Sequence, residues 1–91
     1  MTLKIELPQG AQKLAGDCRE HFADGNNVGE ALDCLVAKYP SLESFLYEEG
    51  RRLRAFVQVF INDRNIRTRG SLACPVATGD RIRIITALAG G

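Results

Sequence analysis

The segment 28–39 places the strongest constraint on how this chain of 91 residues can fold. Its apolar residues recur at the spacing of one face of an α-helix, namely Val28, Ala31, Leu32, Leu35, Val36 and Tyr39. Asn27 suits the N-cap, and Glu30 forms with it a pair resembling a capping box. Pro40 disfavours the helical conformation at the residue before it and so ends the helix. A helix with a single apolar face is stable only against a second layer, which the rest of the chain must supply.

Alternating apolar and polar residues predict three half-buried strands, at residues 3–7, 56–61 and 81–85. Weaker patterns predict strands at 18–22 and 66–67, a further turn of helix at 41–46, and a charged surface loop at 48–52. This order is typical of an α+β domain with one main helix packed on one face of a mixed sheet of four to five strands. If the first and last strands lie side by side in the centre, the arrangement is the β-grasp fold of ubiquitin-like domains.

The predicted core lies between the helix and the sheet. We expect it to contain Leu32, Leu35, Val59, Ile61, Ile82 and Ile84. In the middle strand the alternation turns Val57, Val59 and Ile61 to one face of the sheet. It turns Phe56, Gln58 and Phe60 to the other face. A chain of this length buries somewhat more than about 60% of the surface that its unfolded chain exposes, which is enough for one modest core. We therefore expect one domain at 1–85, followed by a flexible tail at 86–91.

The tail has the sequence Thr86-Ala87-Leu88-Ala89-Gly90-Gly91, and no Lys, Asp or Glu follows Asp80. Six extended residues project roughly 20 Å beyond the last strand. Glycines lack a Cβ, so the end of this arm can enter a slot too narrow for side chains. Most chain ends are simply frayed. The tail alone is therefore suggestive, and the body of the chain must support a functional interpretation.

Charge is unevenly distributed along the chain. Residues 1–50 contain four basic and nine acidic groups, whereas residues 51–91 contain eight arginines and two acidic groups. A basic half fits nucleic acid or an acidic protein surface. We favour a protein partner and no nucleic acid, because Phe56 and Phe60 are the only aromatic residues in this arginine-rich half. No apolar run approaches membrane-spanning length, and the first residues alternate like a strand rather than a signal peptide, so we expect a cytoplasmic protein without membrane contact.

The potentially reactive side chains are Cys18, Cys34, Cys74 and His21. An odd number of cysteines without a C-x-x-C motif argues against a disulfide framework, and their spacing from His21 does not suit a metal site. We expect buried structural thiols and a solvated histidine on an edge strand. No nucleophile–base pair or phosphate-binding loop is evident, so we expect no catalytic residues, no metal site and no enzymatic activity.

Three segments and the chain end carry a family resemblance. Residues 27–32, 56–63 and 78–85, followed by Ala89-Gly90-Gly91, resemble the ubiquitin-like sulfur carriers of the MoaD/ThiS superfamily. They are most similar to the longer, cysteine-biosynthetic carriers of the CysO type. The resemblance spans nearly the whole chain, although residues 8–20 match no feature of these proteins. Thr86 stands where such carriers often place a proline before the tail.

The resemblance implies that Gly91 is the sulfur-carrying residue. Its carboxylate would be adenylated by a ThiF/MoeB-type enzyme that uses ATP, and then converted to a thiocarboxylate. Partner enzymes would recognise the tail, at Ala87, Leu88, Ala89 and Gly90. Phe56, Gln58 and Phe60 are either a docking face for a partner or, for the two phenylalanines, part of the core. The chain itself would bind no cofactor and act as a protein co-substrate.

The acceptor of the sulfur stays open at this point, because every such pathway uses the same thiocarboxylate. Cysteine biosynthesis, with a cysteine synthase-like pyridoxal-phosphate enzyme as acceptor, is our first choice. Alternatives are the small subunit of molybdopterin synthase, with that enzyme's large subunit as partner, and another sulfur-transfer pathway such as thiamine biosynthesis. A modifier conjugated to lysine is less favoured. A nucleic-acid-binding β-grasp domain is a distant fourth interpretation, since it gives no reason for the diglycine.

Overall fold

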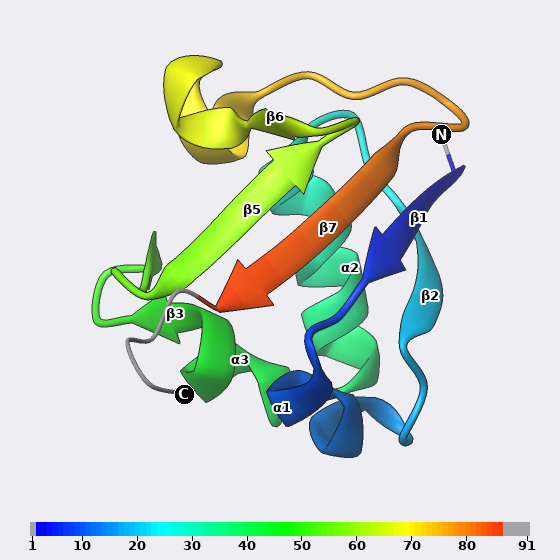
Figure 1. Cartoon of the computed structure of the whole chain (residues 1–91), viewed down its shortest axis with the longest axis vertical. Coiled ribbons are helices and arrows are strands. Elements are labelled where there is room, and N and C mark those ends of the chain that lie inside the picture. Colours follow the sequence, from blue (N-terminus) through cyan, green and yellow to red (C-terminus); the bar gives the residue numbers. More distant parts are fainter. Residues whose placement is uncertain (1, 87–91) are drawn as a thin grey trace.

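The first and last strands of the protein lie side by side in the middle of one sheet. The structure, a computed structural model, describes residues 2–86. Strand β1 (Thr2–Glu6) runs parallel to β7 (Arg81–Thr86), and Ile5 is paired with Ile82. Antiparallel neighbours extend the sheet on both sides: β2 (Glu20–Asp24) lies beside β1, and β5 (Val57–Ile61) and then β6 (Arg64–Asn65) lie beyond β7. The strand order is therefore β2-β1-β7-β5-β6 (Figure 1). This mixed sheet with one main helix confirms the predicted α+β, β-grasp architecture.

Helix α2 (Val28–Lys38) crosses one face of the sheet, as the apolar stripe predicts (Figure 1). Asn27 caps it, because its Oδ1 accepts a hydrogen bond from the backbone N–H of Glu30 at 2.8 Å. The Glu30 carboxylate accepts from the backbone N–H of Asn26 at 2.9 Å, one residue earlier than in a capping box. The cap therefore also fixes the loop that leads into the helix.

The space between α2 and the sheet is filled by the predicted core. All six residues named above are buried, and Leu32, Leu35 and Ile82 are completely inaccessible to solvent. In β5 (Val57–Ile61) the odd-numbered residues are buried and the even-numbered ones half-buried, which confirms the predicted alternation. Strand β7 continues to Thr86, which pairs with Val57, so this strand is one residue longer than predicted.

Residues 8–20, where the sequence showed no clear pattern, form α1 (Gln9–Gln12) and a short 3-10 helix, η1 (Lys13–Ala15). Strand β2 (Glu20–Asp24) then starts two residues later than the predicted 18–22 strand. The reason is a turn in which Gly16 and Asp17 both have positive φ, at 70° and 60°. An extended strand cannot begin until the backbone has left this left-handed region.

The segment predicted as a charged loop at 48–52 contains a small hairpin, made of β3 (Tyr47–Glu48) and β4 (Arg52–Leu53). Gly50 and Arg51 form its turn, with φ of 80° and 59°. The Arg51 guanidinium lies 5.4 Å from the ring centroid of Tyr47 and pairs with Asp33 on α2. Burial of Tyr47 raises the pKa of its phenol above the ordinary value. The preceding helix α3 (Leu42–Leu46) confirms the predicted turn of helix at 41–46.

The predicted return strand at residues 66–67 is wrong. Asn62 and Asp63 both have positive φ, so the chain reverses within two residues and β6 occupies Arg64–Asn65. The Asn65 side chain then accepts from the backbone N–H of Arg67 and caps a 3-10 helix, η2 (Ile66–Thr68). A further 3-10 helix, η3 (Ser71–Ala73), follows before the chain returns to β7.

We predict that Leu35→Ala lowers the free energy of unfolding by about 2–5 kcal/mol, because a fully buried side chain is replaced by a cavity. Chemical denaturation monitored by circular dichroism measures the change. Lys38→Ala, at an exposed position of the same helix, is the control and should stay within about 0.5 kcal/mol of the parent chain. Equal effects of the two substitutions would contradict the assigned helix face.

Candidate functional site

The face of the sheet opposite α2, called here the outer face, carries two of the three residues proposed for docking. Gln58 and Phe60 lie in β5 and are half-buried there. The Gln58 amide oxygen accepts a hydrogen bond from Asn65 Nδ2 at 3.0 Å, which holds its side chain across β5 and β6. Phe60 is paired with Arg83 of β7 on one side and with Asn65 on the other.

Phe56, the third residue proposed for docking, occupies a different environment. It lies in the turn before β5, and its ring packs edge-on against Phe45 of α3 with 6.4 Å between centroids. This pair contacts the main core. The structure thus brings Gln58 and Phe60 together on the outer face and places Phe56 at the end of the sheet.

Two exposed apolar side chains on the outer face were not proposed from the sequence. Phe22 of β2 is 61% exposed and Ile85 of β7 is 39% exposed. Ile85 is paired with Gln58, and Phe22 with Lys4, so both share the face of the paired residue. The period-two pattern could have indicated them, because each lies next to a residue whose side chain points to the core.

A buried carboxylate organises the charges of the outer face. Glu6 of β1 is only 7% exposed, and three guanidinium groups surround it. Arg81 Nη1 lies 3.4 Å from Glu6 Oε2, and Arg19 Nη2 and Arg83 Nε lie 3.7 Å and 3.8 Å from Oε1. Arg83 also pairs with Asp63 at 3.8 Å. Three arginines around one carboxylate leave the centre of this face positive, which suits an acidic partner surface.

An open cavity of about 430 Å³ lies where β7 ends. Its walls include Glu6, Arg19 and Arg83 from the charged cluster, together with Ile85 and Thr86. The charged cluster is therefore continuous with the last described residue of the chain. The predicted sulfur-carrying Gly91, and the tail-recognition residues Ala87, Leu88, Ala89 and Gly90, lie outside the described residues.

The cysteines and the histidine differ partly from expectation. Cys74 is buried, Cys34 is half-buried against the core, and Cys18 is exposed, so the expectation of a buried thiol is wrong for Cys18. His21 is 7% exposed rather than solvated, because its ring packs edge-on against Tyr39 of the α2 C-cap at 5.2 Å. Its Nε2 lies 2.9 Å from the carbonyl oxygen of Cys18.

Within residues 2–86, no cluster of three His, Cys, Asp or Glu side chains is arranged to hold a metal ion. The longest helix there is α2, with 11 residues, and none of the described helices has the length and apolarity to cross a membrane.

We predict that Glu6→Gln lowers the free energy of unfolding by about 1–3 kcal/mol, because three guanidinium groups lose the charge that holds them together. Denaturant unfolding measures the change. Glu20→Gln is the matched control: Glu20 pairs with Lys4 at 3.7 Å on the same face, but both side chains are exposed, so the loss should stay below about 1 kcal/mol. If the two variants are equally stable, Glu6 does not organise the cluster.

Comparison with known proteins agrees with this architecture. A profile of the ThiS family matches residues 5–91. The sulfur carrier protein CysO of Mycobacterium tuberculosis is 29% identical over 93 residues, an alignment that covers all of both chains.

Solved structures show the same likeness. The CysO/BexX complex structure from Amycolatopsis orientalis contains a chain that is 28% identical, with a TM-score of 0.91 and coverage of 98% of this chain and 99% of that one. The small archaeal modifier protein 1 of Methanosarcina acetivorans is also 28% identical, with a TM-score of 0.87 and coverage of 99% and 96%. The family match spans nearly the entire chain, and this protein therefore belongs to the ThiS family of ubiquitin-like, β-grasp sulfur carriers.

Proposed function

We propose that the protein carries sulfur as a thiocarboxylate on Gly91 and donates it for cysteine biosynthesis. The observation that carries the proposal is the family match, which extends through Gly90 to Gly91. The likeness to CysO over the full length of both chains supports the choice of pathway. The protein itself is a co-substrate, and partner enzymes supply the catalysis.

The chemistry of a terminal glycine fits this role. A C-terminal carboxylate is ionised at neutral pH and is a poor acyl donor, because attack by sulfur would have to expel an oxide. Transfer of AMP from ATP to the carboxylate, with release of pyrophosphate, creates an acyl adenylate. Attack by a sulfur donor at the acyl carbon then expels AMP and leaves the C–S bond of a thiocarboxylate. Residues without bulk before the reactive carbon allow a partner enzyme to enclose it.

The position of β7 supports the proposal. Thr86 ends a central strand that is paired with β5 up to Thr86 and with β1 along residues 81–83, so the tail begins from a strand inside the sheet and not from an edge. The outer face begins at the same place, since Ile85 and Arg83 precede Thr86 in β7. An activating enzyme can therefore bind the outer face and the tail at once.

For the activating partner we propose a ThiF/MoeB-type enzyme that docks on the outer face through Gln58, Phe60 and Ile85. The excess of arginine around Glu6 would meet an acidic surface on that enzyme, and Ile85 and Phe60 would be covered on binding. Charge complementarity of this kind mainly speeds association, whereas covered apolar side chains slow dissociation. For the acceptor we propose a cysteine synthase-like enzyme, with the large subunit of molybdopterin synthase as the alternative.

A second candidate function is conjugation of Gly91 to lysine side chains of other proteins. The likeness to a small archaeal modifier protein, which matches 99% of this chain, favours it. The two functions share the adenylation step and differ in the nucleophile that follows, a sulfur donor or a lysine amine. Conjugates of high mass that contain the protein, detected in cell lysates, would support this candidate.

We predict that the protein gains the mass of one oxygen-to-sulfur exchange when it is incubated with ATP, its activating enzyme and a sulfur donor. Mass spectrometry of the C-terminal peptide locates the exchange on Gly91. Gly91→Ala should load severely less sulfur, because a Cβ is added beside the reacting carbon. Circular dichroism of the variant should be unchanged, since every described helix and strand ends by Thr86.

One bulky residue appended after Gly91 is the decisive control, because it removes the free carboxylate from that glycine. If the extended protein gains sulfur while the extra residue is still attached, Gly91 is not the acceptor and the proposal is wrong.

We also predict that Ile85→Asp lowers kcat/KM for adenylation roughly tenfold, mainly through a higher KM, because it places a charge where the activating enzyme must cover an apolar side chain. Steady-state kinetics with the activating enzyme measure the effect. Ala37→Asp is the matched control, since it adds the same charge at an exposed position on α2. An unchanged KM for Ile85→Asp would show that the docking face does not include Ile85.

A further inference from the structure

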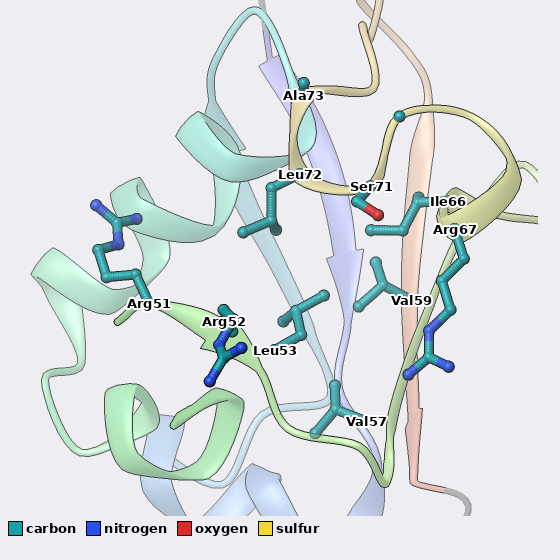
Figure 2. Close-up of a pocket in the computed structure, with 11 residues that line it drawn as sticks. Arg51, Arg52, Leu53, Val57, Val59, Ile66, Arg67, Ser71, Leu72 and Ala73 are labelled. Atoms are coloured by element: carbon teal, nitrogen blue, oxygen red, sulfur yellow. The ribbon is translucent and has the colours of Figure 1, made fainter. Parts of the chain in front are cut away.

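A groove of about 430 Å³ opens on the helix side of the sheet, between the β3–β4 hairpin and the η2–η3 segment. Figure 2 shows apolar side chains from both walls and from β5 pointing into it. These are Leu53, Val57, Val59, Ile66 and Leu72. Val57, Val59 and Ile66 are almost inaccessible to solvent, so Leu53 and Leu72, both half-buried, provide most of the accessible apolar surface. Three arginines line its rim, so the groove combines an apolar floor with a cationic edge.

The arginines of the rim differ in how far they are neutralised. Arg51 is already paired with Asp33, and Arg52 lies 3.9 Å from Glu48 in a pair whose members are both exposed. The Arg67 guanidinium has no ion pair among residues 2–86, and its one hydrogen bond there is a long one, 3.5 Å, to the carbonyl oxygen of Ala55. The groove therefore suits a ligand with an apolar side chain and one negative charge near Arg67.

We propose that the groove binds the protein's own tail, residues 87–91, with Leu88 on the apolar floor and the Gly91 carboxylate at Arg67. The inference rests on the proposed function only in taking Gly91 as the C-terminal residue. It adds a regulatory step to that function, because the reactive end would alternate between this groove and the partner enzymes. A thiocarboxylate is also an anion, so the loaded form fits the same place.

Distances along the chain allow this contact. Thr86 pairs with Val57, which lines the groove, and paired residues in antiparallel strands lie about 5 Å apart. Ala55, the acceptor of the Arg67 hydrogen bond, is only two residues before Val57. Five extended residues reach roughly 16 Å from Thr86. The carboxylate can thus reach the Arg67 guanidinium without any change in the sheet.

The tail of the same molecule is favoured over the tail of a second copy by its local concentration. A short tether holds the attached segment at a millimolar effective concentration, above the concentration of other copies in a dilute solution. If the intrinsic dissociation constant is about 1 mM, similar to the effective concentration of the tail, roughly half of the molecules have a docked tail. An activating enzyme that needs the free tail would then bind about twofold more weakly than it binds a protein that cannot dock.

The test compares backbone amide NMR spectra of the full chain and of a chain that ends at Thr86, which keeps every described strand and helix. We expect the signals of Val59 and Leu72, which are not paired with the new chain end at Thr86, to differ between the two lengths. The difference should vanish when both carry Arg67→Glu. It should persist with Arg64→Glu, the matched control, which makes the same charge change on β6 outside the groove.

Synthetic pentapeptides with the sequence of residues 87–91 complete the experiment. The free acid should shift the groove signals of the shortened chain, with half-saturation at about 1 mM peptide. The C-terminal carboxamide, which lacks the negative charge, should bind at least roughly tenfold more weakly. Identical groove signals in the two chain lengths, or equal binding of acid and carboxamide, would overturn the proposal. Shifts that grow with protein concentration would overturn it in favour of a second copy's tail. No enzyme, ATP or sulfur donor is present, so the outcome is independent of whether Gly91 carries sulfur.

Discussion

The parallel pairing of β1 with β7 is the interaction on which the rest of the structure depends. It joins Ile5 to Ile82 across most of the length of the chain, and both side chains are fully buried. No short turn can connect parallel strands, so the helix and the remaining strands must fit into the intervening chain. The same pairing sets Glu6 opposite Arg83 and so builds the charged centre of the outer face.

The parts of the fold with a regular apolar period were predictable from the sequence. Helix α2, strands β1, β5 and β7 and the core around Leu35 and Ile82 follow from periods of 3.6 and 2, and the structure confirms them. Residues 8–20 were not predictable, because α1 and η1 bury only Ala11 and Ala15, whose small side chains give a weak apolar signal. Composition does indicate a turn at 62–65. The late start of β2 and the early start of β6 depend on positive φ values at Asp17, Asn62 and Asp63, which composition does not specify.

The candidate site was predictable in its chemistry and less so in its surroundings. The diglycine end and the alternation at Gln58 and Phe60 are local features of the sequence. The cluster around Glu6 is not, since Arg19, Arg81 and Arg83 reach it from β7 and from the loop before β2. His21 was misjudged for the same reason: its burial depends on Tyr39, which the fold brings to it from the end of α2.

The central place of β7 has a mechanical consequence for any enzyme that grips the chain beyond Thr86. Tension along β7 would act along the strand and so across its backbone hydrogen bonds, which are perpendicular to the strand toward β5 and slanted toward β1. Such a load is shared by both ladders at once, instead of opening one bond after another as it would at a frayed edge. A partner can therefore pull the end of the chain into a narrow channel and release it again while the β-grasp body stays folded.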